Sequence, residues 1–163
     1  MFKNLFKKSS TPIQLKAPIT GKIVPLEKVP DPVFSQKMMG EGVAIIPKED
    51  NIVAPIEGTI IQIAPSKHAI GLKTPNDMEI LIHVGLETVS LDGEGFRILV
   101  KEGDHVSVGD RLMEADLGYI RNKVEHIITP IVITNSNQNE NEYNLTLEKE
   151  CVAGKTTVLT ISG

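Results

Sequence analysis

The sequence predicts an all-β fold, an antiparallel β-sandwich or a closed, barrel-like sheet with short helical turns. Ten prolines and 13 glycines divide the 163 residues into short runs that are rich in Val, Ile and Thr. No long stretch has the period of an amphipathic helix. Many short strands separated by turns are typical of sandwiches and barrels.

Strands are predicted wherever such a run is bounded by turn residues. In chain order they are residues 21–26, 43–46, 58–63, 69–73, 78–84, 111–115, 131–134, 143–147 and 157–161. Helix is expected only in brief pieces, at residues 32–38 and 117–122. Residues 135–142 are polar and are expected to form an exposed loop.

A weak internal repeat adds to this picture. Residues 17–21 read Ala-Pro-Ile-Thr-Gly, residues 54–58 read Ala-Pro-Ile-Glu-Gly, and residues 129–132 echo the start of the pattern. The repeat predicts quasi-symmetric sheets, although the same five residues are also a common turn into a strand.

Composition excludes several classes of function. The net charge of -4 and the pI of about 5.6 argue against a nucleic-acid partner, which requires concentrated Lys and Arg. Cys151 is the only cysteine, so an internal disulfide cannot form and a thiolate zinc site is not expected. With no signal-peptide pattern and no run long enough to span a membrane, we expect a cytoplasmic protein. We also expect a monomer.

The chain is divided into a tail, residues 1–10, and one domain, residues 11–163. Phe2, Leu5 and Phe6 share one side of a helical wheel and Lys3, Lys7 and Lys8 gather nearby. This pattern predicts transient contact with an anionic membrane surface, and a disordered tail is the alternative.

The best clue to function is a pair of histidines. His68 and His83 lie on two short apolar runs, and the turn-forming residues 74–77 lie midway between them. A symmetric hairpin would place Thr74 opposite Asp77 and therefore His68 opposite His83, with Ile70 opposite Leu81. Two imidazoles on one face of a sheet, with Cβ atoms roughly 5 Å apart, could contact one phosphate, metal ion or proton.

Such a pair suits phosphoryl transfer through histidine. A neutral imidazole is nucleophilic near pH 7, so one ring can attack a phosphoryl group while the other donates a hydrogen bond to its oxygens. Ser66 precedes His68 by two residues and could hydrogen-bond that ring. Metal binding is an alternative, and so are two ordinary strand histidines. His105 and His126 have no comparable context and are expected to be solvated.

Several segments resemble the glucose-type enzyme IIA of the bacterial phosphoenolpyruvate-dependent sugar phosphotransferase system. They are residues 29–42, 67–71 and 80–96, and the most specific is the last, where His, Gly, Thr-Val and Gly-Glu-Gly-Phe follow in order. The resemblance runs from about Leu15 to the C-terminus. It implies an antiparallel β-sandwich and a phosphocarrier that accepts phosphate from phospho-HPr and passes it to a cysteine of an enzyme IIB domain.

The resemblance also implies roles for individual residues. His83 matches the phosphoacceptor, His68 the histidine that stabilises the phosphoryl group, and Ser66 a hydroxyl residue that supports it. The matching partner-binding positions are Asp31, Val33, Phe34, Met38, Leu81, Glu87 and Val89, and Ile70 is expected to join them because it adjoins His68. Phe34, Val33 and Met38 could instead lie on a helix packed inward.

By the same analogy no cofactor is required, while His68 and His83 could share a zinc ion with a partner carboxylate. Enteric relatives further suggest regulated permeases or kinases as partners. The sugar remains open, because its specificity lies in a membrane-bound IIC portion that this chain lacks.

Two other classes of protein fit the sequence less well. A zinc hydrolase of the lysostaphin-like type needs a third ligand and usually a His-x-His pair, which the sequence lacks. A biotinyl or lipoyl carrier is suggested by the glycine turns of residues 102–112, but the Met-Lys or Ala-Lys pair that carries the prosthetic group is missing.

Overall fold

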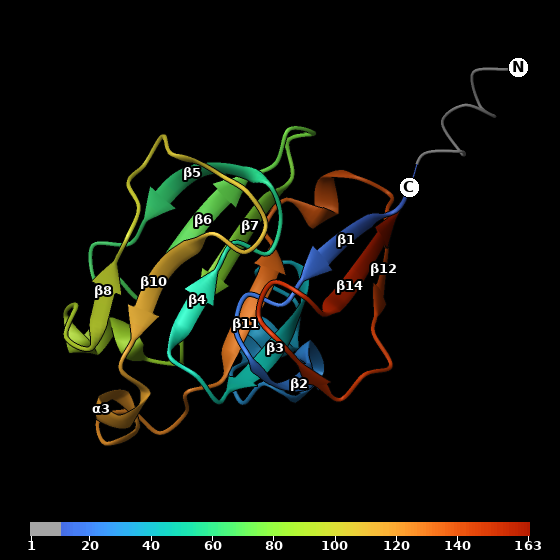
Figure 1. Cartoon of the computed structure of the whole chain (residues 1–163). Helices are drawn as coiled ribbons and strands as arrows, with labels where there is room; N and C mark the ends of the chain where they lie inside the picture. Colours follow the sequence, from blue (N-terminus) through green and yellow to red (C-terminus); the bar gives the residue numbers. More distant parts are fainter. Residues whose placement is uncertain (1–10) are drawn as a thin grey trace, which may run out of the picture.

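The computed structural model describes residues 11–163, so the predictions for the tail, residues 1–10, lie outside the described residues. The domain is built almost entirely from antiparallel strands, as predicted (Figure 1). The largest sheet has eight strands in the spatial order β13 (Glu150–Cys151), β2 (Gly21–Pro25), β3 (Glu41–Pro47), β11 (Thr129–Ile133), β7 (Glu79–His83), β6 (Ala69–Lys73), β5 (Gly58–Ile63) and β9 (His105–Val106).

Two three-stranded sheets complete the sandwich. One has the order β1 (Ile13–Lys16), β14 (Thr157–Ser162) and β12 (Glu142–Leu145), and the other the order β4 (Asn51–Val53), β10 (Arg111–Ala115) and β8 (Phe96–Ile98). The helical pieces are short: η1 (Leu26–Lys28), α2 (Pro32–Ser35), η2 (Thr88–Leu91), α3 (Leu117–Arg121) and η3 (Ser136–Gln138). No helix within residues 11–163 is long and apolar enough to cross a membrane.

The main core lies between the large sheet and the two small ones. It combines buried side chains of β6 and β7, such as Leu72 and Ile80, with Leu15 of β1 and Leu112 of β10. Alternate residues of a strand face opposite sides of its sheet, so the other face of the large sheet needs its own cover. There Leu26 of η1, Phe34 of α2 and Val29 between them pack against Ala44 and Val132 in a smaller apolar cluster.

The internal repeat is a real structural symmetry. Lys16 N–H donates to the carbonyl of Pro55 at 2.9 Å, and reciprocally Val53 N–H donates to the carbonyl of Pro18 at 2.8 Å. The two copies also make equivalent bonds to later segments: Ala17 N–H to Thr156 and Ala54 N–H to Asp110, then Gly154 N–H to Ala17 and Gly109 N–H to Ala54. Residues 129–132 share only the letters of the pattern, because they run through β11 inside the large sheet.

Most strand predictions are confirmed, with differences at the ends. Residues 58–63, 69–73 and 111–115 coincide with β5, β6 and β10. The sequence missed β1, β4, β8, β9 and β13, and both predicted helices end earlier than expected. The polar run 135–142 is only partly an exposed loop, since Ser136 is buried and its Oγ accepts a hydrogen bond from Glu41 N–H at 3.0 Å.

Candidate functional site

The turn between β6 and β7 decides where the two histidines lie, and it holds one residue more than predicted. Thr74 N–H donates to the carbonyl of Met78 at 2.9 Å, and Asp77 N–H donates to the carbonyl of Thr74 at 2.9 Å. Asp77 has φ +67°, a left-handed conformation that Asp tolerates better than most residues. The result is a three-residue loop that ends in a bulge, one of the common hairpin connections.

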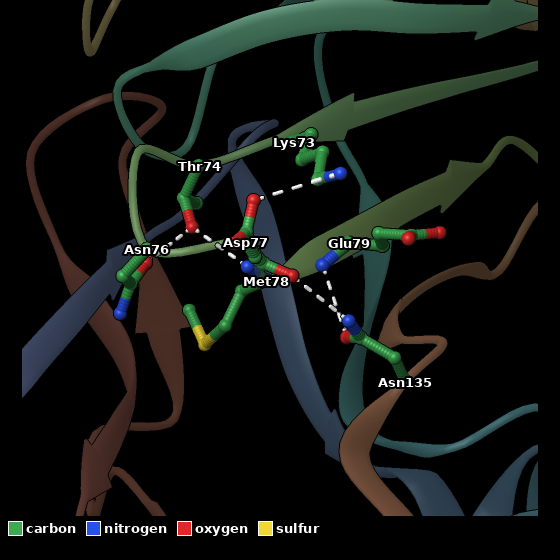
Figure 2. Close-up of polar contacts among 7 residues, drawn as sticks. All are labelled: Lys73, Thr74, Asn76, Asp77, Met78, Glu79 and Asn135. Atoms are coloured by element: carbon green, nitrogen blue, oxygen red, sulfur yellow. Dashed lines mark hydrogen bonds and ion pairs between the residues drawn. The ribbon is translucent and has the colours of Figure 1, made fainter. Parts of the chain in front are cut away.

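Side chains hold this turn in place (Figure 2). Thr74 Oγ1 accepts a second bond from Met78 N–H at 3.0 Å, and Lys73 Nζ lies 3.5 Å from Asp77 Oδ1. Asn135, which follows β11, links the turn to the start of β7: its Oδ1 accepts from Glu79 N–H at 3.0 Å and its Nδ2 donates to the Asp77 carbonyl at 2.9 Å. The bulge is therefore fixed from both sides.

The predicted register of the hairpin is wrong by one residue as a result. Ala69, not His68, is paired with His83, and Gly71, not Ile70, is paired with Leu81. A slip of one residue turns every side chain of a strand to the other face. Ile70 accordingly points into the core with no exposed surface, so its expected place in the docking patch is wrong.

The two rings nevertheless touch. His68 lies just before β6 and follows Lys67, whose φ is +62°. The direction of its side chain is therefore not set by the alternation of side chains between the two faces of the sheet. The ring centroids of His68 and His83 are 4.8 Å apart and the ring planes are nearly perpendicular, at 81°. The ring of Phe34 lies on the other side of His83, with centroids 5.2 Å apart.

A hydrogen bond to the backbone orients His83. Its Nδ1 lies 2.8 Å from the carbonyl oxygen of Gly85. A carbonyl oxygen can only accept, so Nδ1 carries the proton and the lone pair is left on Nε2. Gly85 has φ +75°, and a Cβ there would lie 2.6 Å from Cγ2 of Thr88, so the turn that supplies this carbonyl requires glycine.

His68 is the more buried of the two residues. It keeps only 8% of its surface exposed, and its buried Nδ1 has no hydrogen-bond partner among the described residues. The Ser66 backbone lies near this ring, but the Ser66 hydroxyl makes no hydrogen bond to it. The support expected from Ser66 Oγ is therefore not made in this structure.

The surroundings of both rings favour the neutral form of histidine. Burial lowers the pKa of His83 below its ordinary value of 6.5, although the Gly85 carbonyl and the charge of Asp31 act in the opposite direction. Burial also lowers the pKa of His68, and repulsion from His83 adds to that effect. A pair of neutral imidazoles can accept a proton or an electrophile, whereas two adjacent cations could not.

The two rings line a cleft of about 290 Å³ together with most of the predicted docking residues. Asp31, Val33, Phe34, Glu87 and Val89 all line it, and Asp31 also caps α2 by accepting from Val33 N–H at 3.0 Å. Val33 and Val89 are exposed at the rim, whereas Phe34 is buried, so the alternative of an inward-packed helix holds for Phe34 only.

Met38 and Leu81 do not line the cleft of the two histidines, contrary to the prediction, whereas Met39 does. Met38 is 69% exposed but does not line the cleft, while the neighbouring Met39 does. Leu81 is half-buried and lines a second groove beside His68. Sequence reasoning missed Met39, and its position next to Met38 in the same segment was the signal that could have found it.

The remaining histidines lie outside the cleft. His105 and His126 are at least partly exposed and lie beside Glu57 and Glu125 respectively. Within residues 11–163 no three His, Cys, Asp or Glu side chains are grouped so that they could hold a metal ion. His68 and His83 could supply two nitrogen ligands, and further ligands would have to come from elsewhere.

Comparisons with known proteins identify the family of the chain. Residues 13–139 match the model of the family described as the phosphoenolpyruvate-dependent sugar phosphotransferase system, EIIA 1. Proteins named "PTS system glucose-specific EIIA component" from Staphylococcus epidermidis and Staphylococcus aureus are each 48% identical over 165 residues, covering 99% of this chain and 99% of the relative.

A solved structure, the glucose permease IIA from Mycoplasma capricolum, superposes with a TM-score of 0.84 at 37% identity, covering 93% of this chain and 96% of that one. The fold, the histidine pair and the match along the chain therefore lead to one conclusion. The chain belongs to the EIIA 1 family of the phosphoenolpyruvate-dependent sugar phosphotransferase system, and it is a phosphocarrier in sugar uptake and phosphorylation.

Proposed function

We propose that His83 accepts a phosphoryl group from phospho-HPr and passes it to a cysteine of an enzyme IIB domain. The family implies that this protein works with HPr and with an EIIB or permease component. The observation that carries the choice of residue is the 2.8 Å contact between His83 Nδ1 and the Gly85 carbonyl, which leaves the lone pair on Nε2.

The transfer needs no group beyond the two partners. Nε2 of His83 attacks phosphorus, the bond between phosphorus and the donor breaks, and the electron pair of that bond stays with the donor. In the second half a cysteine thiolate of the IIB domain attacks phosphorus, and the bond to Nε2 breaks. Because the ring lies between His68 and Phe34, it is partly shielded from water, which slows loss of the phosphoryl group to hydrolysis.

His68 is proposed to stabilise the phosphoryl group. Its ring stands nearly perpendicular to that of His83, so an N–H on its Nε2 can donate to a phosphoryl oxygen while Nδ1 accepts. In that tautomer Nδ1 needs a donor, and a rotation of the Ser66 hydroxyl is one way to supply it. Ser66 is thus proposed as a positioning residue for His68.

The rim of the cleft suits brief contact with partners. Val33 and Val89 offer exposed apolar surface, and Asp31 and Glu87 place two carboxylates beside it. A carrier must release each partner after transfer, so we expect an interface of roughly 1,200 Å² or less in total. We also expect the free protein to be a monomer, which sedimentation velocity would test.

The sugar is proposed to be glucose. The relatives from Staphylococcus carry the words "glucose-specific" in their names, and their similarity to this chain covers 99% of its length. The test is growth: this chain should restore phosphotransferase-dependent glucose uptake to cells that lack their own glucose EIIA. Restoration with another sugar only would contradict the proposal.

The role of the histidines is tested by phosphorylation in a purified system. Wild type, His83→Ala, His68→Ala and the control His105→Ala are incubated with phosphoenolpyruvate, enzyme I and HPr, and their intact masses are measured. We expect one acid-labile phosphate on wild type and on His105→Ala, and none on His83→Ala. His68→Ala should accept phosphate but pass it poorly to a IIB domain.

Labelling of His83→Ala as complete as that of wild type would overturn the assignment. A zinc ion shared by His68, His83 and a partner carboxylate is a separate proposal. It predicts that added zinc tightens the complex with a partner, and that His68→Ala abolishes this tightening.

A further inference from the structure

The peptide group between Gly85 and Leu86 is hydrogen-bonded at both of its ends. Its carbonyl oxygen lies 2.8 Å from Nδ1 of His83, and its N–H donates to the carbonyl of His126 at 3.0 Å. The C=O and N–H of a trans peptide point in opposite directions, so this one plane links His83 to the segment that precedes β11. The orientation of the plane therefore decides which nitrogen of His83 carries the proton.

Glycine at position 85 does not fix this orientation by itself. Glycine adopts positive and negative φ about equally well, so the φ of +75° at Gly85 is one of several conformations open to it. Glu87 also has a left-handed backbone, with φ +59°, which is uncommon for a residue that has a side chain. A segment with two such residues depends on contacts with its neighbours to keep one conformation.

Thr88 supplies two of those contacts and has no exposed surface. Its Oγ1 donates to the carbonyl of Val84 at 2.7 Å, and that carbonyl belongs to the peptide that enters Gly85. Its Cγ2 fills the space beside Gly85, because a Cβ built on that glycine would lie 2.6 Å from it. One buried side chain thus holds the segment through a hydroxyl and a methyl group.

The orientation of the Gly85 carbonyl matters to the chemistry of His83. Without this acceptor the proton can move to Nε2, and a protonated nitrogen cannot attack phosphorus. Once Nε2 binds phosphorus, the ring gains positive charge and the bond from Nδ1–H to the carbonyl becomes charge-assisted. The carbonyl therefore stabilises the transition state more than the free ring, which is the condition for accelerating a reaction.

We propose that Thr88 is a positioning residue for phosphoryl transfer. Its hydroxyl, bonded to the Val84 carbonyl, and its methyl group, beside Gly85, keep the next peptide turned so that its carbonyl accepts from His83 Nδ1. The proposal rests on the proposed function, because it takes Nε2 of His83 as the nucleophile. Thr88 does not line the cleft of the two histidines, so it acts through the backbone.

Three variants separate this role from a general effect on stability. Thr88→Val keeps the shape of the side chain and removes the hydroxyl, whereas Thr88→Ser keeps the hydroxyl. Thr20→Val is the matched control, because Thr20 Oγ1 accepts from Ala153 N–H at 2.9 Å and neither residue lines the cleft. Circular dichroism and urea unfolding establish that each variant is folded and how much stability it has lost.

The first measurement is the tautomer of His83, from the ¹⁵N chemical shifts of its ring above the pH at which it titrates. Wild type, Thr88→Ser and Thr20→Val should carry the proton mainly on Nδ1, and Thr88→Val should carry a larger share on Nε2. The bond to the Gly85 carbonyl raises the pKa of His83, so that pKa should be lower in Thr88→Val than in wild type.

The second measurement is the rate of phosphorylation by phospho-HPr and by phosphoramidate, a small donor that needs no docking. Thr88→Val should be about three- to tenfold slower with both donors, as expected for the loss of one buried hydrogen bond. The change should lie in kcat, with KM for phospho-HPr unchanged, because the docking surface is intact. Thr88→Ser and Thr20→Val should transfer at close to the wild-type rate.

The wild-type tautomer and wild-type rates in Thr88→Val would overturn the proposal. So would equal slowing in Thr20→Val, because the effect would then follow stability alone, or slowing in Thr88→Ser as large as in Thr88→Val. If Thr88→Val does not fold, Thr88→Ala takes its place with the same expected and contradicting results. Failure of the proposed function would appear separately, as labelling of His83→Ala, whereas the tautomer is measured without any transfer.

Discussion

Val84 donates its backbone N–H to the carbonyl of His68 at 2.8 Å, one residue beyond the paired part of β6 and β7. This bond holds the backbone of His68 beside the residue that follows His83. The two rings are thus brought together by a diagonal relationship across the strands and not by direct pairing. Their distance depends on the backbone of the hairpin, so it should be sensitive to changes in the turns at both ends of the strands.

Gly85→Ala should lower both stability and phosphorylation. The φ of +75° is unfavourable for alanine, and its Cβ would meet Thr88 Cγ2 at 2.6 Å, so we expect a loss of about 1–3 kcal/mol in urea unfolding. Gly103→Ala is the control, since its φ is +95° and a Cβ there meets nothing within 4 Å. Equal losses in the two variants would show that the contact with Thr88 does not matter.

Asn135→Ala should weaken the β6–β7 turn. The substitution leaves the part-buried Glu79 N–H without its partner, which costs about 1–3 kcal/mol, whereas the exposed Asp77 carbonyl can bond to water. Asn144→Ala on the exposed strand β12 provides the control. Hydrogen exchange should then show faster exchange of Glu79 N–H in Asn135→Ala, and unchanged protection there would contradict the bridging role.

Asp31→Asn should change the titration of His83 without unfolding α2. Asparagine caps a helix about as well as aspartate, so the bond to Val33 N–H can be kept while the charge is lost. Because the charge of Asp31 raises the pKa of His83, its loss should lower that pKa further. NMR titration of the ring resonances measures this directly. An unchanged or higher pKa of His83 would contradict the electrostatic contact.

Acid should destabilise the protein through the histidine pair. Both pKa values are lowered in the folded protein, so the unfolded chain binds more protons once the pH falls below the ordinary value of 6.5. The stability associated with the neutral rings is fully present above pH 6.5 and is lost as the pH falls toward the folded-state values.

The matching experiment is urea unfolding of wild type and of the double variant His68→Gln, His83→Gln between about pH 7 and pH 5. Wild type should lose more stability over this range than the double variant, which lacks both of these rings. Parallel curves would mean that neither ring has a lowered pKa. The same lowering predicts that phosphoramidate labelling of wild type stays fast below pH 6.5, where an ordinary imidazole is protonated.

The role of the Ser66 hydroxyl can be tested by Ser66→Thr, which keeps a hydroxyl, and Ser66→Ala, which removes it. If its hydroxyl serves Nδ1 of His68 during transfer, Ser66→Thr should keep wild-type transfer to a IIB domain, whereas Ser66→Ala should slow it by about three- to tenfold. The readout is kcat for transfer to the IIB domain, with stability measured in parallel. Equal rates for Ser66→Ala and wild type would leave the Ser66 hydroxyl without a role.

The sequence could predict the fold class and most strands because apolar runs and turn residues are local signals. It could also predict the histidine pair, the acids Asp31 and Glu87, and the rim residues Val33 and Val89, through resemblance to a known family. It could not predict the register of the hairpin, because that depends on Asp77 adopting a left-handed conformation that Asn135 holds from a distant segment. The mistaken place of Ile70 follows from that single residue.

The missed strands have a related cause. β9 and β13 have two residues each, and they are strands only because β5 and β2 lie beside them. Short segments of this kind carry no periodic pattern of their own. Their partners are chosen by the closing of the sheets, which no local window of sequence can show.

The symmetry of the two repeats has a consequence for the order in which a growing chain can fold. β4 pairs with β10, and both lie within residues 51–115, whereas β1 pairs with β14 at the opposite end of the chain. One half of the sandwich is therefore nested inside the other along the polypeptide. On the ribosome the inner half, with the hairpin that bears both histidines, can assemble first, and the outer half must wait for the last strand to emerge.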